Sequence, residues 1–142
     1  MSDLLNIIRK NFGKNLLEEK IHNQRRVYME ISPAFIRRAS EFLFNQMKMR
    51  FATASGVDEK EWMEIVYHFS FDREGLLFNL RVKLDKKNPR VDTITDIITG
   101  AKWIERELNE LFGIEFEGND DMRNLLLSDA YKGDKHPLRK HD

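Results

Sequence analysis

Four charged residues in one short helix pattern are the first candidates for chemistry. They are Glu105, Arg106, Glu107 and Glu110, in the stretch WIERELNELFGIEFEG that begins at Trp103. Two carboxylates act as an acid and base pair only when their side chains converge on one reacting group. Side chains two residues apart on a helix do not face each other, and Glu105 and Glu107 have this spacing. The pattern alone therefore favours a solvated helix surface over acid-base catalysis.

Other residue types offer little further chemistry. The four histidines lack metal-ligand spacing, and we expect them on the surface or at its rim: His22, His68, His136 and His141. The sequence contains no cysteine, which excludes disulfides, thiol nucleophiles and cysteine-ligated iron-sulfur or zinc sites in these 142 residues. Any redox centre that works with this chain must then lie on another chain.

Composition narrows the class of protein. With 41% hydrophobic and 34% charged residues the sequence predicts one soluble domain. The 24 basic and 24 acidic residues cancel, which argues against a binder of duplex nucleic acid. No apolar run reaches the roughly 18 residues of a membrane-spanning helix, and the first residues lack a signal-peptide core. We therefore expect a protein of the cytoplasm.

The elements that must position the charged helix are predicted from periodicity. Apolar spacing predicts a helix over 4–16 and, after Ser32 as N-cap and Pro33 as first helical residue, a second helix. Alternation predicts strands at 25–32, 51–57, 62–71 and 77–84, the last two joined by a hairpin turn at 72–75. Thr95 and Asp96 could cap a single turn before the main helix. The predicted fold class is α+β, with a mostly antiparallel sheet, helices packed on one face, a charged helix and an extended C-terminal arm.

The charged helix itself has a predicted buried face and a predicted end. On a helical wheel Arg106 points directly away from the apolar stripe, whereas Glu105 and Glu107 flank it, where a core or partner surface begins. The stripe consists of Ala101, Ile104, Leu108, Leu111 and Phe112. Gly113 stands where a left-handed residue ends a helix, and Ile114 follows as the apolar residue that folds back.

The last residues are difficult to place in an isolated domain. Pro137 blocks regular structure, and Leu138 lies among basic residues without periodic neighbours. One interpretation is a basic terminus without structure of its own. The other is an extended arm whose Arg139 docks on a neighbouring chain by forked hydrogen bonds, which lysine reproduces poorly. We divide the chain into a domain at 1–118 and an arm at 119–142.

The order of these pieces resembles one family. AKWIERELNELFGIEFEGNDDMRNLLL followed by HPLRK, over residues 101–140, resembles the signature of the thirty-kilodalton (NuoC-like) subunits of respiratory complex I and of membrane-bound nickel-iron hydrogenases. In that family a Trp-x-Glu-Arg-Glu helix leads to Phe-Gly-Ile-x-Phe-x-Gly, a leucine-rich turn and Pro-Leu-Arg-Lys. The matching positions are Trp103, Glu105, Arg106, Glu107, Phe112, Gly113, Ile114, Phe116, Gly118, Arg123, Leu125, Leu126, Pro137, Leu138, Arg139 and Lys140.

The resemblance implies a scaffold within a redox enzyme. Proteins of this kind hold no cofactor and no active site, and they pack on a large catalytic subunit beside a small iron-sulfur subunit. Nickel-iron and iron-sulfur centres belong to those partners, through which alone the scaffold meets the cytoplasmic face of the membrane. The resemblance places the partner interface at Trp103, Glu105, Arg106, Glu107, Arg123, Pro137, Leu138, Arg139 and Lys140.

Departures from the family pattern bear on the branch. Asn109-Glu110-Leu111 stands where Tyr-Asp-Met is common, and Gly118-Asn119-Asp120 stands where Gly-His-Pro is usual. The Glu-Leu-Phe-Gly form is more similar to the hydrogenase branch, which couples electron transfer to ion translocation. The alternatives are the equivalent subunit of an NADH or ferredoxin:quinone oxidoreductase or of a sulfur-reducing relative, and more remotely a stand-alone enzyme, nucleic-acid binder or other binding module.

Overall fold

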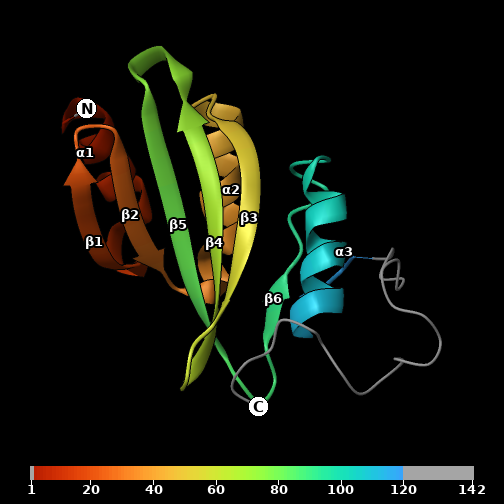
Figure 1. The fold of residues 1–142 in the computed structure, drawn as a ribbon. Helices are drawn as coiled ribbons and strands as arrows, with labels where there is room; N and C mark the ends of the chain where they lie inside the picture. Colours follow the sequence, from red (N-terminus) through yellow and green to blue (C-terminus); the bar gives the residue numbers. More distant parts are fainter. Residues whose placement is uncertain (1, 120–142) are drawn as a thin grey trace.

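The computed structural model describes residues 2–119 and confirms the α+β class. A five-stranded sheet has the order β1-β2-β5-β4-β3, and a separate pair is formed by β6 and β7. In Figure 1, α1 and α2 lie behind the large sheet, while α3 stands beyond β3, at the opposite side from β1. The bounds are α1 Ser2–Phe12, β1 Leu16–Asn23, β2 Arg26–Ile31, α2 Ile36–Glu41, β3 Arg50–Asp58, β4 Trp62–Phe71, β5 Leu76–Asp85, β6 Arg90–Asp92, α3 Ala101–Phe112 and β7 Glu115–Glu117.

The central hairpin follows directly from the alternation in its sequence. Tyr67 pairs with Leu80 and Phe69 with Phe78, and all four side chains are buried on the helix side. Gly75 closes the turn with a φ of 63°, a left-handed conformation that suits glycine. Strand pairing is antiparallel except between β2 and β5, which are parallel. The prediction of a mostly antiparallel sheet is therefore confirmed.

The core lies between this sheet and the helices. The ring of Phe12 on α1 meets those of Phe35, Phe42 and Phe78 edge to face, with centroids 5.5, 6.4 and 6.5 Å apart. Burial of each such side chain stabilises the fold by about 1.5–3 kcal/mol. The second helical segment begins at Pro33 as predicted, with a 3₁₀ turn, Pro33–Phe35, although the Ser32 hydroxyl makes no capping hydrogen bond.

The first predicted helix is too long. It ends at Phe12, and Leu16 already belongs to β1. Gly13 has a φ of 54°, which breaks the helix, and the following residues gain backbone hydrogen bonds by pairing with β2. Strand β1 was missed because it forms an edge whose side chains are mostly exposed, so it shows no apolar alternation.

The face of the sheet opposite α1 and α2 carries polar cross-strand contacts. Glu64 on β4 accepts two hydrogen bonds from the guanidinium of Arg81 on β5, at 2.9 and 3.0 Å. Lys83 contacts Glu30 at 3.4 Å and lies 4.5 Å from the ring centroid of Trp62. Within residues 2–119 no helix covers this side, which we call the open face.

Candidate partner-binding surface

Helix α3 is seated on the edge strand β3 through one close contact. A Cβ at Gly56 would lie 2.7 Å from Cε2 of Phe112, so only glycine leaves room for the ring. The helix ends as predicted at Gly113, whose φ is 77° and whose N–H donates to the carbonyl of Asn109 at 2.9 Å. The amide of Asn109 donates in turn to the carbonyl of Ile114, at 3.0 Å. Both contacts fix the position at which the chain leaves the helix.

Glu105 faces inward from α3 and joins two loops. Its side chain is almost fully buried, and the residue is 1% exposed. It accepts hydrogen bonds from Oγ1 of Thr93 at 2.5 Å, from the N–H of Ile94 at 2.9 Å and from Nδ2 of Asn119 at 2.9 Å. Burial raises the pKa of the Glu105 carboxyl, although the three donors act in the opposite direction. This carboxylate therefore holds the segment before α3 to the segment after β7.

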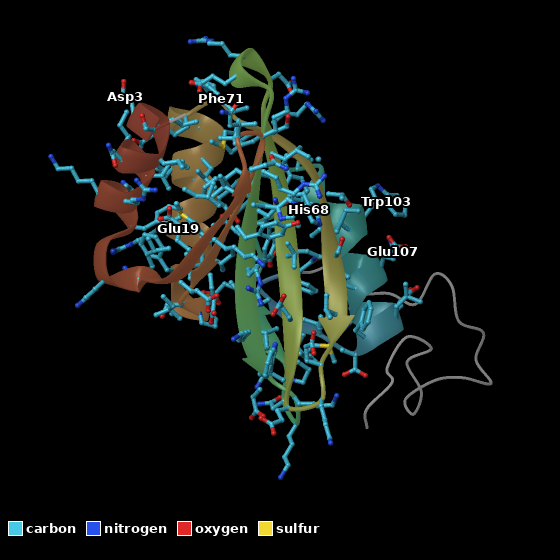
Figure 2. All side chains as sticks on the ribbon, turned by 60° about the vertical axis from the view of Figure 1, so that its left-hand side comes forward. Asp3, Glu19, His68, Phe71, Trp103 and Glu107 are labelled. Carbon is cyan, nitrogen blue, oxygen red and sulfur yellow. The ribbon has the colours of Figure 1, made fainter. Side chains whose placement is uncertain are left out.

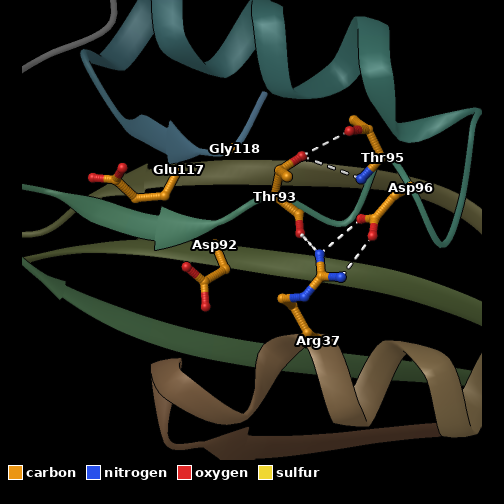
Figure 3. Close-up of a pocket in the computed structure, with 7 residues that line it drawn as sticks. All are labelled: Arg37, Asp92, Thr93, Thr95, Asp96, Glu117 and Gly118. Carbon is orange, nitrogen blue, oxygen red and sulfur yellow. Dashed lines mark hydrogen bonds and ion pairs between the residues drawn. The ribbon is translucent and has the colours of Figure 1, made fainter. Parts of the chain in front are cut away.

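The Thr93 segment also forms the wall of a hollow. The guanidinium of Arg37 donates to both carboxylate oxygens of Asp96, at 2.7 and 2.6 Å, and to the carbonyl of Thr93 at 2.6 Å, as Figure 3 shows. The bond to Asp96 holds the pKa of Arg37 above its usual value, and Arg37 holds the pKa of Asp96 below its usual value. The hollow measures about 590 Å³ and is lined by Arg37, Asp92, Thr93, Thr95, Asp96, Glu117 and Gly118.

The expected single turn before α3 is present, but its hydrogen bonds differ from the prediction. The N–H groups of Ile97 and Ile98 both donate to the carbonyl of Ile94. Thr93, and not Thr95 or Asp96, accepts from the start of this turn, through its Oγ1 and the N–H of Thr95 at 3.1 Å. Asp96 instead binds Arg37 on α2, a contact between residues 59 positions apart.

Arg106 corrects the helical-wheel prediction. The wheel places it away from the buried side, yet it is only 8% exposed. Its guanidinium lies 5.1 Å from the ring centroid of Trp103, one turn earlier, and Arg106 and Glu110 each have further interaction partners. The wheel failed because it assumes that one side of a helix faces water, whereas α3 is enclosed on more than one side. Glu110, a predicted surface charge, is likewise 1% exposed.

Trp103 and Glu107 form the outward side of α3. Trp103 is 64% exposed, more than any other large apolar side chain among residues 2–119. Figure 2 shows Trp103 and Glu107 projecting from the outer side of α3, away from the sheet. Of the predicted interface, Trp103 and Glu107 are thus exposed, Arg106 supports the indole, and Glu105 is engaged within the chain. The other predicted interface residues lie outside the described part: Arg123, Pro137, Leu138, Arg139 and Lys140.

Sequence reasoning missed Arg37, Thr93 and Asn119 as members of this arrangement. Each comes from a different segment, and only the folded chain brings them beside Glu105 or its loop. The placement of Glu105 beside the apolar stripe was a usable signal, because a carboxylate at such a boundary needs donors. Among the described residues, no group of three or more histidines and carboxylates is arranged to hold a metal ion. No helix within 2–119 is long and apolar enough to cross a membrane.

Comparison with known proteins adds relatives to this geometry. The chain is 44% identical over 69 residues to NADH-quinone oxidoreductase subunit 5 of Thermus thermophilus, covering 49% of this chain and 32% of that protein. It is 30% identical over 118 residues to the corresponding NADH-quinone oxidoreductase protein of Ruegeria pomeroyi, covering 79% and 58%. The chain thus spans less than two thirds of the length of these curated relatives.

Solved structures and a family model extend the likeness to nearly the whole chain. A chain in the structure of the membrane-bound sulfane sulfur reductase, an archaeal respiratory membrane complex, superposes with a TM-score of 0.80 at 25% identity. The alignment covers 99% of this chain and 85% of that one. The model of the family described as respiratory-chain NADH dehydrogenase, 30 Kd subunit, matches residues 29–142. The chain belongs to this family.

Proposed function

We propose that this chain is a cofactor-free structural subunit of a membrane-bound redox complex, where it packs on the large catalytic subunit through the outer side of α3. The observation that carries the proposal is Trp103, a large indole 64% exposed on an otherwise well-packed helix. Arg106 holds its guanidinium against that ring. Tryptophan and arginine are the residue types that most often dominate the energy of protein interfaces.

The buried network behind Trp103 supports the same role. Interfaces bind tightly when their surface is rigid before the partner arrives, because less conformational entropy is then lost on binding. Glu105 ties α3 to the two loops beside it, and Gly56 lets Phe112 seat the helix on β3. Glu105 is thus a positioning residue in this proposal and exchanges no proton with a substrate.

The partner belongs to the same proposal. A large subunit of the nickel-iron hydrogenase type, with a small iron-sulfur subunit, would carry the redox centres, and the complex would couple electron transfer to ion movement. This chain would then lie at the cytoplasmic face of the membrane and touch it only through its partners. Residues 119–142 would form an arm that docks on the same partner through Arg139.

Co-expression of the full chain with its complex tests the role of α3. We expect Trp103→Ala to reduce recovery of the intact complex at least about tenfold, because interface tryptophans commonly contribute about 2 kcal/mol or more to binding. Trp62→Ala is the matched control, since Trp62 is a half-buried tryptophan on β4 whose ring lies against Lys83. Normal assembly of the Trp103 variant would refute the proposed surface.

A second candidate is the equivalent subunit of a sulfur-reducing complex. It is favoured by the likeness over 99% of this chain to a chain of the archaeal sulfane sulfur reductase complex. The two candidates differ in the large subunit, because a nickel-iron centre needs cysteine ligands. Mass spectrometry of the native complex, with metal analysis, distinguishes them. Stoichiometric nickel supports the hydrogenase branch, and its absence supports a sulfur- or quinone-reducing relative.

A further inference from the structure

Three side chains form a hydrogen-bonded row on the open face, apart from α3. Ser55 lies on β3, His68 on β4 and Asn79 on β5, directly across from His68. The Oγ of Ser55 is 3.0 Å from Nε2 of His68, and Nδ1 of His68 is 2.6 Å from Oδ1 of Asn79. In Figure 2, His68 lies over the middle of the sheet, while Trp103 and Glu107 lie on α3 at its side. This row has no part in the proposed partner surface.

The direction of each hydrogen bond follows from the buried end of the row. Nδ2 of Asn79 donates to the carbonyl of Val27 at 3.1 Å, which fixes the orientation of the amide. The Oδ1 atom therefore faces His68, and because it can only accept, Nδ1 must carry the proton. In the neutral imidazole, Nε2 then presents a lone pair to the hydroxyl of Ser55. A hydroxyl, a base and a group that orients the base are the parts of an activated nucleophile.

Exposure and space follow the same order. Asn79 is 4% exposed, His68 is half-buried and Ser55 is exposed, so the hydroxyl is at the solvent end. A hollow of about 300 Å³ adjoins the row, within the size range of small-molecule sites. Its lining includes Val66, the cross-strand partner of Ser55, and Tyr28, the cross-strand partner of Asn79. A small molecule in this hollow would lie beside the Ser55 hydroxyl.

We propose that Ser55 is a nucleophilic serine that accepts an acyl group from a small activated ester. The Oγ atom forms a bond to the acyl carbon while its proton passes to Nε2 of His68. The bond from the acyl carbon to the leaving oxygen breaks, and the leaving alkoxide takes the proton from His68. The products are an ester of Ser55 and an alcohol, so atoms and charge balance without any other reactant. Asn79 is a positioning residue that holds the tautomer of His68.

A purely structural role for the row makes a different prediction. The same hydrogen bonds tie β3, β4 and β5 together, and their loss would lower stability without any special reactivity at Ser55. Reactivity at one oxygen atom, and not stability, therefore decides between the two roles. Ser32 supplies an internal reference, since it is a half-buried serine whose hydroxyl caps no helix.

The test treats the full chain with p-nitrophenyl acetate and maps acetylated residues by peptide mass spectrometry. General-base assistance contributes about 100-fold or more, so we expect Ser55 to be acetylated at least about tenfold faster than Ser32. His68→Gln should remove this advantage while circular dichroism shows a folded chain. Asn79→Leu should reduce it as well, whereas Asn79→Asp, which still accepts from Nδ1, should retain it.

Two results would overturn the inference. One is a Ser55 rate within about tenfold of that of Ser32 in the wild-type chain. The other is unchanged labelling of Ser55 in a folded His68→Gln chain. If that variant fails to fold, the wild-type ratio of Ser55 to Ser32 and the contrast between the two Asn79 variants still decide the question. Neither measurement depends on assembly with a partner, so it can fail or succeed independently of the proposed function.

Discussion

The buried carboxylates of Glu105 and Glu64 have different kinds of partners. Glu105 on α3 accepts from a hydroxyl, a backbone N–H and an amide, three neutral donors that come from irregular segments. Glu64 on the sheet accepts from the fork of Arg81, a cation on the neighbouring strand. The first carboxylate holds loops in place, whereas the second neutralises a charge on a backbone that strand pairing already fixes.

Electrostatics separates the two sites in the same way. Burial raises the pKa of Glu105, because neutral donors do not fully replace the water that its charge has lost. At the second site, the hydrogen bonds to Glu64 raise the pKa of Arg81. A carboxylate held by neutral donors thus titrates towards neutral pH, while an ion pair keeps both of its charges.

Removal of the Glu105 carboxylate should have the largest effect. In Glu105→Ala, Thr93, Ile94 and Asn119 would each lose an acceptor inside the protein. Because each buried donor left unsatisfied costs about 1–3 kcal/mol, we expect a loss of about 2–5 kcal/mol in the free energy of unfolding. Urea denaturation measures it, with Glu107→Ala on the exposed side of α3 as the control, expected within about 0.5 kcal/mol of wild type. Equal losses in both variants would contradict the loop-holding role.

Removal of the sheet carboxylate should cost less. In Glu64→Ala the guanidinium of Arg81 loses its partner, but its side chain is 25% exposed and water can replace part of the interaction. We expect a loss of about 1–3 kcal/mol by urea denaturation. The double variant Glu64→Leu with Arg81→Met should recover most of this loss, because it leaves no unpaired charge. If the double variant is less stable than Glu64→Ala, the carboxylate does more than neutralise Arg81.

The left-handed end of α3 tests whether Glu105 alone fixes this region. A β-branched side chain tolerates a φ of 77° poorly, so Gly113→Val should destabilise the chain by about 1–2 kcal/mol in denaturant titration. Gly100→Ala is the control at the other end of the helix, where φ is −62° and a Cβ would meet nothing within 4 Å. That variant should match or slightly exceed wild-type stability. Unchanged stability in Gly113→Val would show that the glycine is not needed.

The smallest effect is a difference in the sign of pH dependence. Glu105 has a raised pKa in the folded chain, so its folded state binds the proton more tightly than the unfolded state does. The stability of wild type relative to Glu105→Gln should therefore increase as the pH falls from about 7 towards about 4.3, the pKa of a free glutamate.

Glu19 supplies the opposite case. Its hydrogen bond to Arg9 lowers its pKa in the folded chain, so this contribution is present above about 4.3 and is lost as the pH falls through the folded pKa. The advantage of wild type over Glu19→Gln should therefore decrease on acidification. Thermal unfolding of wild type and both variants from about pH 7 to about pH 3.5 gives the two slopes, and slopes of equal sign would contradict this assignment.

Local patterns predicted the parts of the fold that local chemistry determines. The alternation of β4 and β5, the turn at Gly75 and the end of α3 at Gly113 all follow from neighbouring residues. Strand β1 and the pair of β6 with β7 were not predicted, because their strand conformation depends on partners distant in the sequence. Arg106 was misplaced because its burial depends on what surrounds α3, which a helical wheel does not describe.

The same distinction applies to the candidate site. Motif order pointed to α3, and the family match supports that direction. The donors to Glu105 come from positions 11 to 14 residues away along the chain, and Arg37 reaches Asp96 across 59 residues. Such contacts leave no periodic signal in one sequence, so only the folded chain reveals them.

The parallel pairing of β6 with β7 has a mechanical consequence. The chain arrives from the sheet at Arg90, the first residue of β6, and departs at Glu117, the last residue of β7. A pull on the chain beyond Asn119, resisted by the sheet, therefore acts on opposite ends of two parallel strands. It loads their backbone hydrogen bonds together, in shear, including those from Thr93 to Glu117 and from Glu115 to Pro89. Tension can thus pass from the sheet to whatever holds the C-terminal residues without unwinding α3.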